Sequence, residues 1–117
     1  MLEQLYTIIE IADNVARVRL NPESAIYKAH FPGNPITPGV CQVGMVEELA
    51  AKICGCGLFL REVKMLKFME IMKPSEVEVE VRFDRIGRDG DTVEVKGAVM
   101  SGGRIFTKFS LIFGVIA

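Results

Sequence analysis

The chain has 117 residues, half of them apolar and a quarter charged, and its formal net charge at pH 7 is −1. This length suits a single domain, residues 1–117, that is large enough to bury its own hydrophobic core. The balanced charge and the lack of a basic run exclude a nucleic-acid-binding protein, and no uncharged apolar stretch reaches the roughly 18 residues of a membrane span.

The three cysteines, Cys41, Cys54 and Cys56, predict packing residues rather than a disulfide framework or a metal site. Their odd number and the lack of a signal-peptide pattern favour a cytoplasmic protein over a secreted one. Cys54 and Cys56, with the single histidine His30, supply too few ligands for a tetrahedral metal site. We therefore expect neither a metal nor another cofactor.

The N-terminal third of the chain predicts two strands followed by a loop. Residues 5–11 and 16–20 are short runs rich in β-branched residues, and Asp13 and Asn14 separate them. Residues 21–39 contain four of the five prolines, so we expect an irregular loop whose path is fixed by the proline rings.

A helix is predicted next. Thr37 is a suitable N-cap, Pro38 a suitable first helical residue, and Gly55 a suitable stop after residues 40–54. Apolar residues cover most of the circumference of this helix, with only three charges among them, which is typical of a buried helix.

The second half of the chain predicts a sheet. Apolar and charged residues alternate without a break over 76–83, as in a strand with one buried and one solvated face. Further strands are expected over 58–69, 92–100 and 105–115, with turns at 87–91 and 101–103. The predicted α+β architecture is an antiparallel sheet wrapped around one long central helix, in the element order of a hot-dog fold.

Residues 30–40 read His-Phe-Pro-Gly-Asn-Pro-Ile-Thr-Pro-Gly-Val. This segment resembles the HFPGxPxxPGV signature of the 3-hydroxyacyl-acyl-carrier-protein dehydratase family at all eight fixed positions. Lys67-Phe68 and Lys73-Pro74 resemble a second family segment, and the likeness covers essentially the whole chain. The resemblance implies dehydration of a (3R)-3-hydroxyacyl thioester on acyl carrier protein to the trans-2-enoyl thioester. The implied pathway is fatty-acid synthesis or a related synthesis of lipids or polyenes.

This dehydration needs a base for the C2 proton, an acid for the C3 hydroxyl, and donors that polarise the thioester carbonyl. His30 is the only histidine and the expected base, because imidazole titrates near neutral pH. The N–H groups of Gly39 and Val40, at the positive end of the helix, are expected to receive the thioester oxygen. Gly33 and Gly39 allow the backbone to approach a ligand closely.

The chain departs from the family pattern at the second catalytic group. The resemblance implies a helix acid that serves the histidine of the other subunit, but the matching residue here is Gly44, which has no side chain. The first hypothesis is that Glu48 replaces this acid, because it shares the helix face of Gly44 and its side chain leans toward the helix N-terminus. Glu47 is a weaker candidate of the same kind.

Two other hypotheses stay open. In the second, a paralogous hot-dog chain supplies the missing carboxylate. In the third, the chemistry has changed, and the chain is a weak acyl thioesterase or a subunit that binds acyl carrier protein substrates without turning them over.

The resemblance also implies an acyl tunnel between helix and sheet. We expect Phe31, Gly44, Met45 and Phe68 to line it, with Phe31 also anchoring the loop to the core. Four more apolar residues are candidates for the same wall: Leu49, Met65, Leu66 and Met69.

The expected partners are an acyl carrier protein and a second hot-dog chain. Because acyl carrier protein is acidic, we expect basic residues at the tunnel mouth. The candidates are Arg61, Lys64, Lys67, Lys73, Arg85 and Arg88. An open sheet edge predicts a homodimer or larger assembly, or a hetero-oligomer with a paralogue. The sequence leaves open the acyl chain length, the choice between acyl carrier protein and coenzyme A, and the choice between dimer and hexamer.

Overall fold

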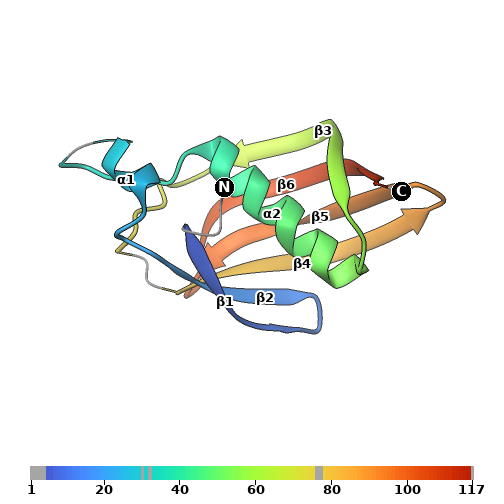
Figure 1. Cartoon of the computed structure of the whole chain (residues 1–117), viewed down its shortest axis with the longest axis horizontal. Helices are drawn as coiled ribbons and strands as arrows, with labels where there is room; N and C mark the ends of the chain where they lie inside the picture. The colour runs from blue at the N-terminus through green and yellow to red at the C-terminus, as the bar shows by residue number, and fades with distance from the viewer. Residues whose placement is uncertain (1–4, 30, 32, 76–77, 117) are drawn as a thin grey trace.

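The computed structural model describes residues 5–29, 31, 33–75 and 78–116. The elements in chain order are β1 (Tyr6–Ala12), β2 (Val15–Leu20), α1 (Ala25–Ala29), α2 (Gly39–Cys54), β3 (Leu58–Phe68), β4 (Glu78–Asp89), β5 (Thr92–Ser101) and β6 (Arg104–Val115). Within the described residues the strands form one six-stranded antiparallel sheet in the order β1-β2-β4-β5-β6-β3. α2 lies across one face of this sheet, and α1 lies beyond its end (Figure 1). The α+β prediction is confirmed.

The hydrophobic core fills the space between α2 and the sheet. Every second residue is buried in β2, and in β4 as far as Phe83, as the alternation in the sequence predicts. From the helix, Met45 and Leu49 are completely buried against this sheet face. Burying each such side chain contributes roughly 1.5–3 kcal/mol. The core therefore fixes α2, and with it the loop that precedes it, relative to the sheet.

Two-residue hairpins join β1 to β2 and β4 to β5. Asp13 and Asn14 both have positive φ, 52° and 60°, between the paired residues Ala12 and Val15. Positive φ at both central positions is typical of the type I′ turn, whose twist matches that of the flanking strands. The predicted break at Asp13-Asn14 is confirmed.

The second hairpin corrects the predicted turn at 87–91. β4 continues to Asp89, which pairs with Thr92, so the turn comprises only Gly90 and Asp91. A register shift between Phe83 and Arg85 places one extra residue in β4. The alternation of apolar and charged residues therefore does not continue through the second half of this strand.

The predicted N-cap of α2 is wrong. Pro38 occupies the N-cap position with extended backbone (φ −60°, ψ 147°), and no side chain caps the helix. The Thr37 hydroxyl instead forms a 2.8 Å hydrogen bond with the Tyr27 hydroxyl. The backbone N–H of Thr37 donates to the Met72 carbonyl at 2.7 Å. Tertiary partners thus use the groups that a local capping argument assigns to the helix. Gly55, with φ 72°, ends α2 as predicted.

A short helix, α1, replaces part of the predicted irregular loop. The Ile26 N–H donates to the Ser24 hydroxyl at 3.3 Å, and the buried Tyr27 ties this turn to the core. No proline falls between Pro22 and Pro32, so one helical turn fits between them.

The two sheet edges differ in character. β1 forms one edge and β3 the other. β3 leaves a row of large apolar side chains exposed, namely Phe59, Leu60, Val63, Met65 and Phe68. Within the described part of the chain, no helix has the length and hydropathy needed to cross a membrane.

Candidate active site

The described residues of the predicted motif lead into the N-terminus of α2. His30 and Pro32 lie outside the described residues, so the position of the predicted base is not part of the site described below. Phe31 is 55% exposed, so its expected role as an anchor on the core is wrong. Tyr27 takes that place, because its ring is buried under the loop. Gly33 has a φ of 82°, which favours glycine at this turn of the loop.

A buried chain of polar side chains holds the N-terminus of α2. Tyr27 and Thr37 are hydrogen-bonded through their hydroxyls, and the Gln42 amide donates to the Thr37 carbonyl at 3.4 Å. The Thr107 hydroxyl of β6 donates to the side-chain carbonyl oxygen of Gln42 at 2.5 Å. These bonds connect α1, the motif loop, α2 and the sheet. The sequence signal for this network is Gln42, the one uncharged polar side chain of α2.

Gly39 and Val40 precede the first hydrogen bonds of α2. The Pro38 carbonyl accepts from the N–H groups of Cys41 and Gln42, at 3.0 and 3.1 Å. The two preceding N–H groups therefore have no intrahelical acceptor, as in any helix start. The Val40 side chain is 80% exposed. This geometry suits the predicted role of both amides as donors to an oxyanion.

A hollow of about 300 Å³, called here the motif hollow, adjoins Gly39. It lies between residues 36–39 and residues 68–72, with Gln42 at its wall. A Cβ atom on Gly39 would lie 2.5 Å from the Phe68 ring. Glycine therefore leaves room for the close approach of the Phe68 ring, and a larger residue would require this ring to move. Phe68, one of the predicted tunnel residues, borders the motif hollow.

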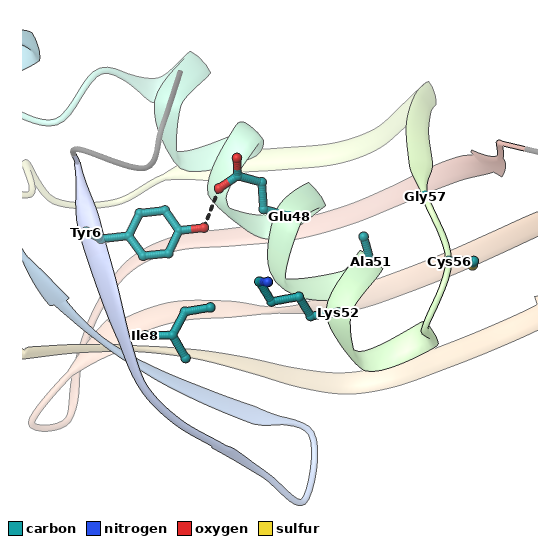
Figure 2. Close-up of a pocket in the computed structure, with 7 residues that line it drawn as sticks. All are labelled: Tyr6, Ile8, Glu48, Ala51, Lys52, Cys56 and Gly57. Atoms are coloured by element: carbon teal, nitrogen blue, oxygen red, sulfur yellow. Dashed lines mark hydrogen bonds between the residues drawn. The ribbon is translucent and has the colours of Figure 1, made fainter.

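The two candidate acids point to opposite sides of α2. Glu48 accepts a 2.5 Å hydrogen bond from the hydroxyl of Tyr6 on β1 (Figure 2). Burial, with the hydrogen bond and charge of Glu48, raises the pKa of the Tyr6 hydroxyl well above its usual range. Burial raises the pKa of the Glu47 carboxyl, and the nearby backbone of Leu60 on β3 partly offsets this effect.

Glu48 and Tyr6 line a second space of about 590 Å³ between β1 and the C-terminal half of α2, the lateral cavity. Figure 2 shows Ile8 and Ala51 on its walls and Lys52 projecting from α2. The described residues that line the lateral cavity and the motif hollow are different sets. Glu48 is therefore not brought to the motif hollow within one protomer. Sequence reasoning missed Tyr6, which lies 42 residues from its partner.

The other predicted tunnel residues are spread through the fold. Met45 and Leu49 are completely buried in the core, and Gly44 is half-buried on α2. Leu66 borders a gap between α2 and the sheet that is too small to hold a water molecule. Met65 and Met69 are exposed, on and just after β3. The described part of a single protomer thus does not hold these residues along one open channel.

Ion pairs occupy several of the predicted basic residues. Arg61 pairs with Asp91 at 3.2 Å, while Lys64 and Arg85 both approach Glu94, at 3.1 and 3.8 Å. Surface pairs of this kind are worth little in stability, but they reduce the positive field that a carrier protein meets.

A six-stranded antiparallel sheet around one long helix defines a hot-dog protein, as predicted. The ApeI-like family model, described as ApeI dehydratase, matches residues 9–103, and the chain belongs to this dehydratase family. The predicted class of enzyme, a dehydratase, is thereby confirmed.

Individual relatives agree with this assignment. The chain is 31% identical over 80 residues to the 3-hydroxyacyl-[acyl-carrier-protein] dehydratase FabZ of Latilactobacillus sakei, covering 62% of this chain and 57% of that protein. It is 34% identical over 101 residues to FabZ of Acetivibrio thermocellus, covering 74% and 66%. The chain thus spans less than two thirds of the length of both proteins. The dehydratase heterocomplex ApeI:P from Xenorhabdus doucetiae shares the fold, with a TM-score of 0.65, 18% identity, and coverage of 93% of this chain and 97% of that one.

Proposed function

We propose that the chain dehydrates a (3R)-3-hydroxyacyl thioester carried on acyl carrier protein, in fatty-acid synthesis or a related synthesis of lipids or polyenes. His30 removes the C2 proton, the C3 hydroxyl leaves as water with a proton from an acid, and the product is the trans-2-enoyl thioester. The N–H groups of Gly39 and Val40 receive the thioester oxygen as negative charge develops on it. The observation that supports this proposal most is the family match over residues 9–103, which includes the whole motif segment.

The acid in this proposal comes from α2 of a second copy. Glu47 lies toward β3, and burial raises its pKa, which keeps more of its protonated form available near neutral pH. We therefore place Glu47 first. Glu48, the stronger candidate from sequence, is the alternative, and the Tyr6 hydroxyl already occupies one of its oxygens.

Pairing of two copies along β3 follows from the character of that edge. An open edge strand presents unpaired backbone groups, and a contiguous exposed apolar patch marks an interaction site. The row from Phe59 to Phe68 combines both features on one strand. A homodimer joined there brings α2 of each copy toward the motif of the other.

The second candidate function is a subunit of a hetero-oligomer in which a paralogous hot-dog chain supplies the carboxylate. Gly44 at the position of the family acid favours it. The ApeI:P structure, a dehydratase heterocomplex, gives a precedent for a hetero-oligomer that includes a chain of this fold.

The deciding experiment incubates the purified chain with 3-hydroxyacyl-acyl carrier protein and follows the loss of water by mass spectrometry. Wild type should turn over, and His30→Ala should lose about 10²–10⁴-fold in rate. Glu47→Gln and Glu48→Gln, run side by side, identify the acid as the variant with the larger loss.

No turnover by a folded oligomer would contradict the stand-alone dehydratase. Activity restored by adding a paralogous chain with an intact helix acid would then establish the hetero-oligomer. Release of free acid instead of water would identify a thioesterase.

A further inference from the structure

The face of the sheet that points away from α2 carries a row of cations across neighbouring strands. Arg82 of β4 pairs in register with Ala98 of β5, which pairs with Lys108 of β6, which pairs with Lys67 of β3. Residues directly opposite each other in an antiparallel ladder lie on the same face. Lys108 and Lys67 are therefore direct cross-strand neighbours, an arrangement of like charges that destabilises a sheet.

The next row adds a fourth cation and a hydroxyl. Lys96 lies two residues before Ala98 on β5, so it shares the face, and it pairs in register with Ser110 of β6. A hollow of about 530 Å³ is bordered by Arg82, Lys96, Lys108 and Ser110, with Ala98 in its wall. We call this space the basic hollow. Ala98 is buried, so the hollow is closed beneath by sheet and small side chains.

The acids near the basic hollow neutralise only part of its positive charge. Asp84 borders the hollow and pairs with Arg82 at 3.1 Å. Glu94, the other nearby carboxylate, contacts Lys64 and Arg85, and its pKa is lowered first by the Lys64 hydrogen bond and less by the charge of Lys96. For Lys96 and Lys108, no ion pair is found among the described residues.

We propose that the basic hollow binds a phosphate group, either free phosphate or the phosphate of a small phosphorylated molecule. An arginine fork, two lysines and a serine hydroxyl supply charge-assisted donors around one space, the donor set that phosphate oxygens require. A bound dianion offsets the repulsion between the clustered cations. The site lies on the sheet face opposite α2, so it is separate from the proposed catalytic site and does not depend on the dehydratase proposal.

The test is calorimetric titration of the wild-type chain with inorganic phosphate, against chloride at equal ionic strength. Saturable binding is expected, and Lys96→Gln/Lys108→Gln should weaken it at least tenfold. Lys28→Gln, which removes an exposed lysine on α1, is the matched control and should bind as wild type does. A parallel titration with adenosine 5′-monophosphate distinguishes an organic phosphate ligand, which binds more tightly than phosphate, from free phosphate.

Thermal unfolding keeps the test independent of folding defects. Without phosphate, the double variant should be at least as stable as wild type, because repulsion among the cations is relieved. With phosphate, wild type should gain in Tm and the double variant should not. The proposal is overturned if wild type shows no saturable binding at constant ionic strength, or if Lys28→Gln weakens binding as much as the double variant.

Discussion

The pair of Tyr6 and Glu48 is the most informative contact at the scale of single residues. The Tyr6 side chain is buried beside α2, and its hydroxyl donates a hydrogen bond to the half-buried carboxylate of Glu48. A hydrogen bond to a charged acceptor contributes about 1.5–3 kcal/mol where both groups are buried, and less where solvent reaches one of them. The contact therefore serves chiefly to fix the direction of Glu48, away from the motif hollow of its own protomer.

Tyr6→Phe tests this pair through the pH dependence of stability. The pKa of Tyr6 is raised above its ordinary value of 10.0, so the folded chain holds this proton more tightly than the unfolded chain. The stability that neutral Tyr6 contributes is complete below pH 10 and is lost as pH rises above it. Chemical denaturation from about pH 9 to pH 11 should therefore show a shallower fall in unfolding free energy for Tyr6→Phe than for wild type.

Tyr27 provides the comparison for this prediction. Burial also raises the pKa of Tyr27, so wild type and Tyr6→Phe share its contribution, and only the difference between them reports on Tyr6. Equal slopes in the two proteins would show that burial and Glu48 do not raise the pKa of the Tyr6 hydroxyl in the folded chain.

At the scale of elements, the β4–β5 pairing depends on a glycine. The register shift after Phe83 brings the backbone of β4 against Gly97, where a Cβ atom would lie 1.9 Å from the Arg82 carbonyl oxygen. Backbone cannot move aside as a flexible side chain can. The bulge and the glycine are thus one feature, which shapes the sheet next to the basic hollow.

Gly97→Ala should consequently destabilise the chain by about 3 kcal/mol or more, or prevent folding. Gly87→Ala is the matched control on β4, because its Cβ would meet only the Arg85 side chain at 3.5 Å. Urea unfolding followed by circular dichroism measures both variants. A loss at Gly97 no larger than that at Gly87 would mean that the strands relax around the added methyl group.

The motif loop is also an element-scale feature, because its position depends on buried bonds rather than on its own prolines. Tyr27, Thr37, Gln42 and Thr107 tie it to three other elements. A loop held in this way keeps the amides of Gly39 and Val40 in one orientation, which lowers the entropic cost of ordering a substrate there.

At the scale of the whole molecule, the two edges of the sheet predict different consequences of the same change. Val63→Lys places a charge within the exposed apolar row of β3, where Val63 is 47% exposed, and should convert an oligomer into a monomer with little loss of stability. Thr7→Lys places the same charge on exposed β1, at the opposite edge, and should leave assembly unchanged. Sedimentation velocity separates these outcomes.

Activity measured on the same two variants links assembly to catalysis. If the acid comes from a second copy, Val63→Lys should lose most of its turnover and Thr7→Lys should keep it. A fully active monomer would contradict a site shared between subunits.

Much of the fold was predictable because it depends on local patterns. Neighbouring residues alone are enough to interpret three of these patterns. They are the unbroken alternation over 76–83, the largely apolar segment after Pro38 and the stop at Gly55. The one-turn helix α1 and the extension of β4 to Asp89 were missed, because a buried tyrosine and a register shift decide them. For the candidate site, the motif was enough to predict the reaction chemistry. The positions of Glu47 and Glu48 relative to the motif could not be predicted from the sequence.

The sequence by itself determined the order of the strands and of the long helix, the antiparallel sheet around that helix, and the dehydratase family. These follow from periodicity and from a contiguous motif, which are properties of the chain read in order. Only the tertiary structure decided that Thr37 bonds Tyr27 rather than capping α2, that Glu48 meets Tyr6, and that Lys108 lies beside Lys67. Each of these contacts joins different elements, and the register and packing that create them arise only when the whole core closes.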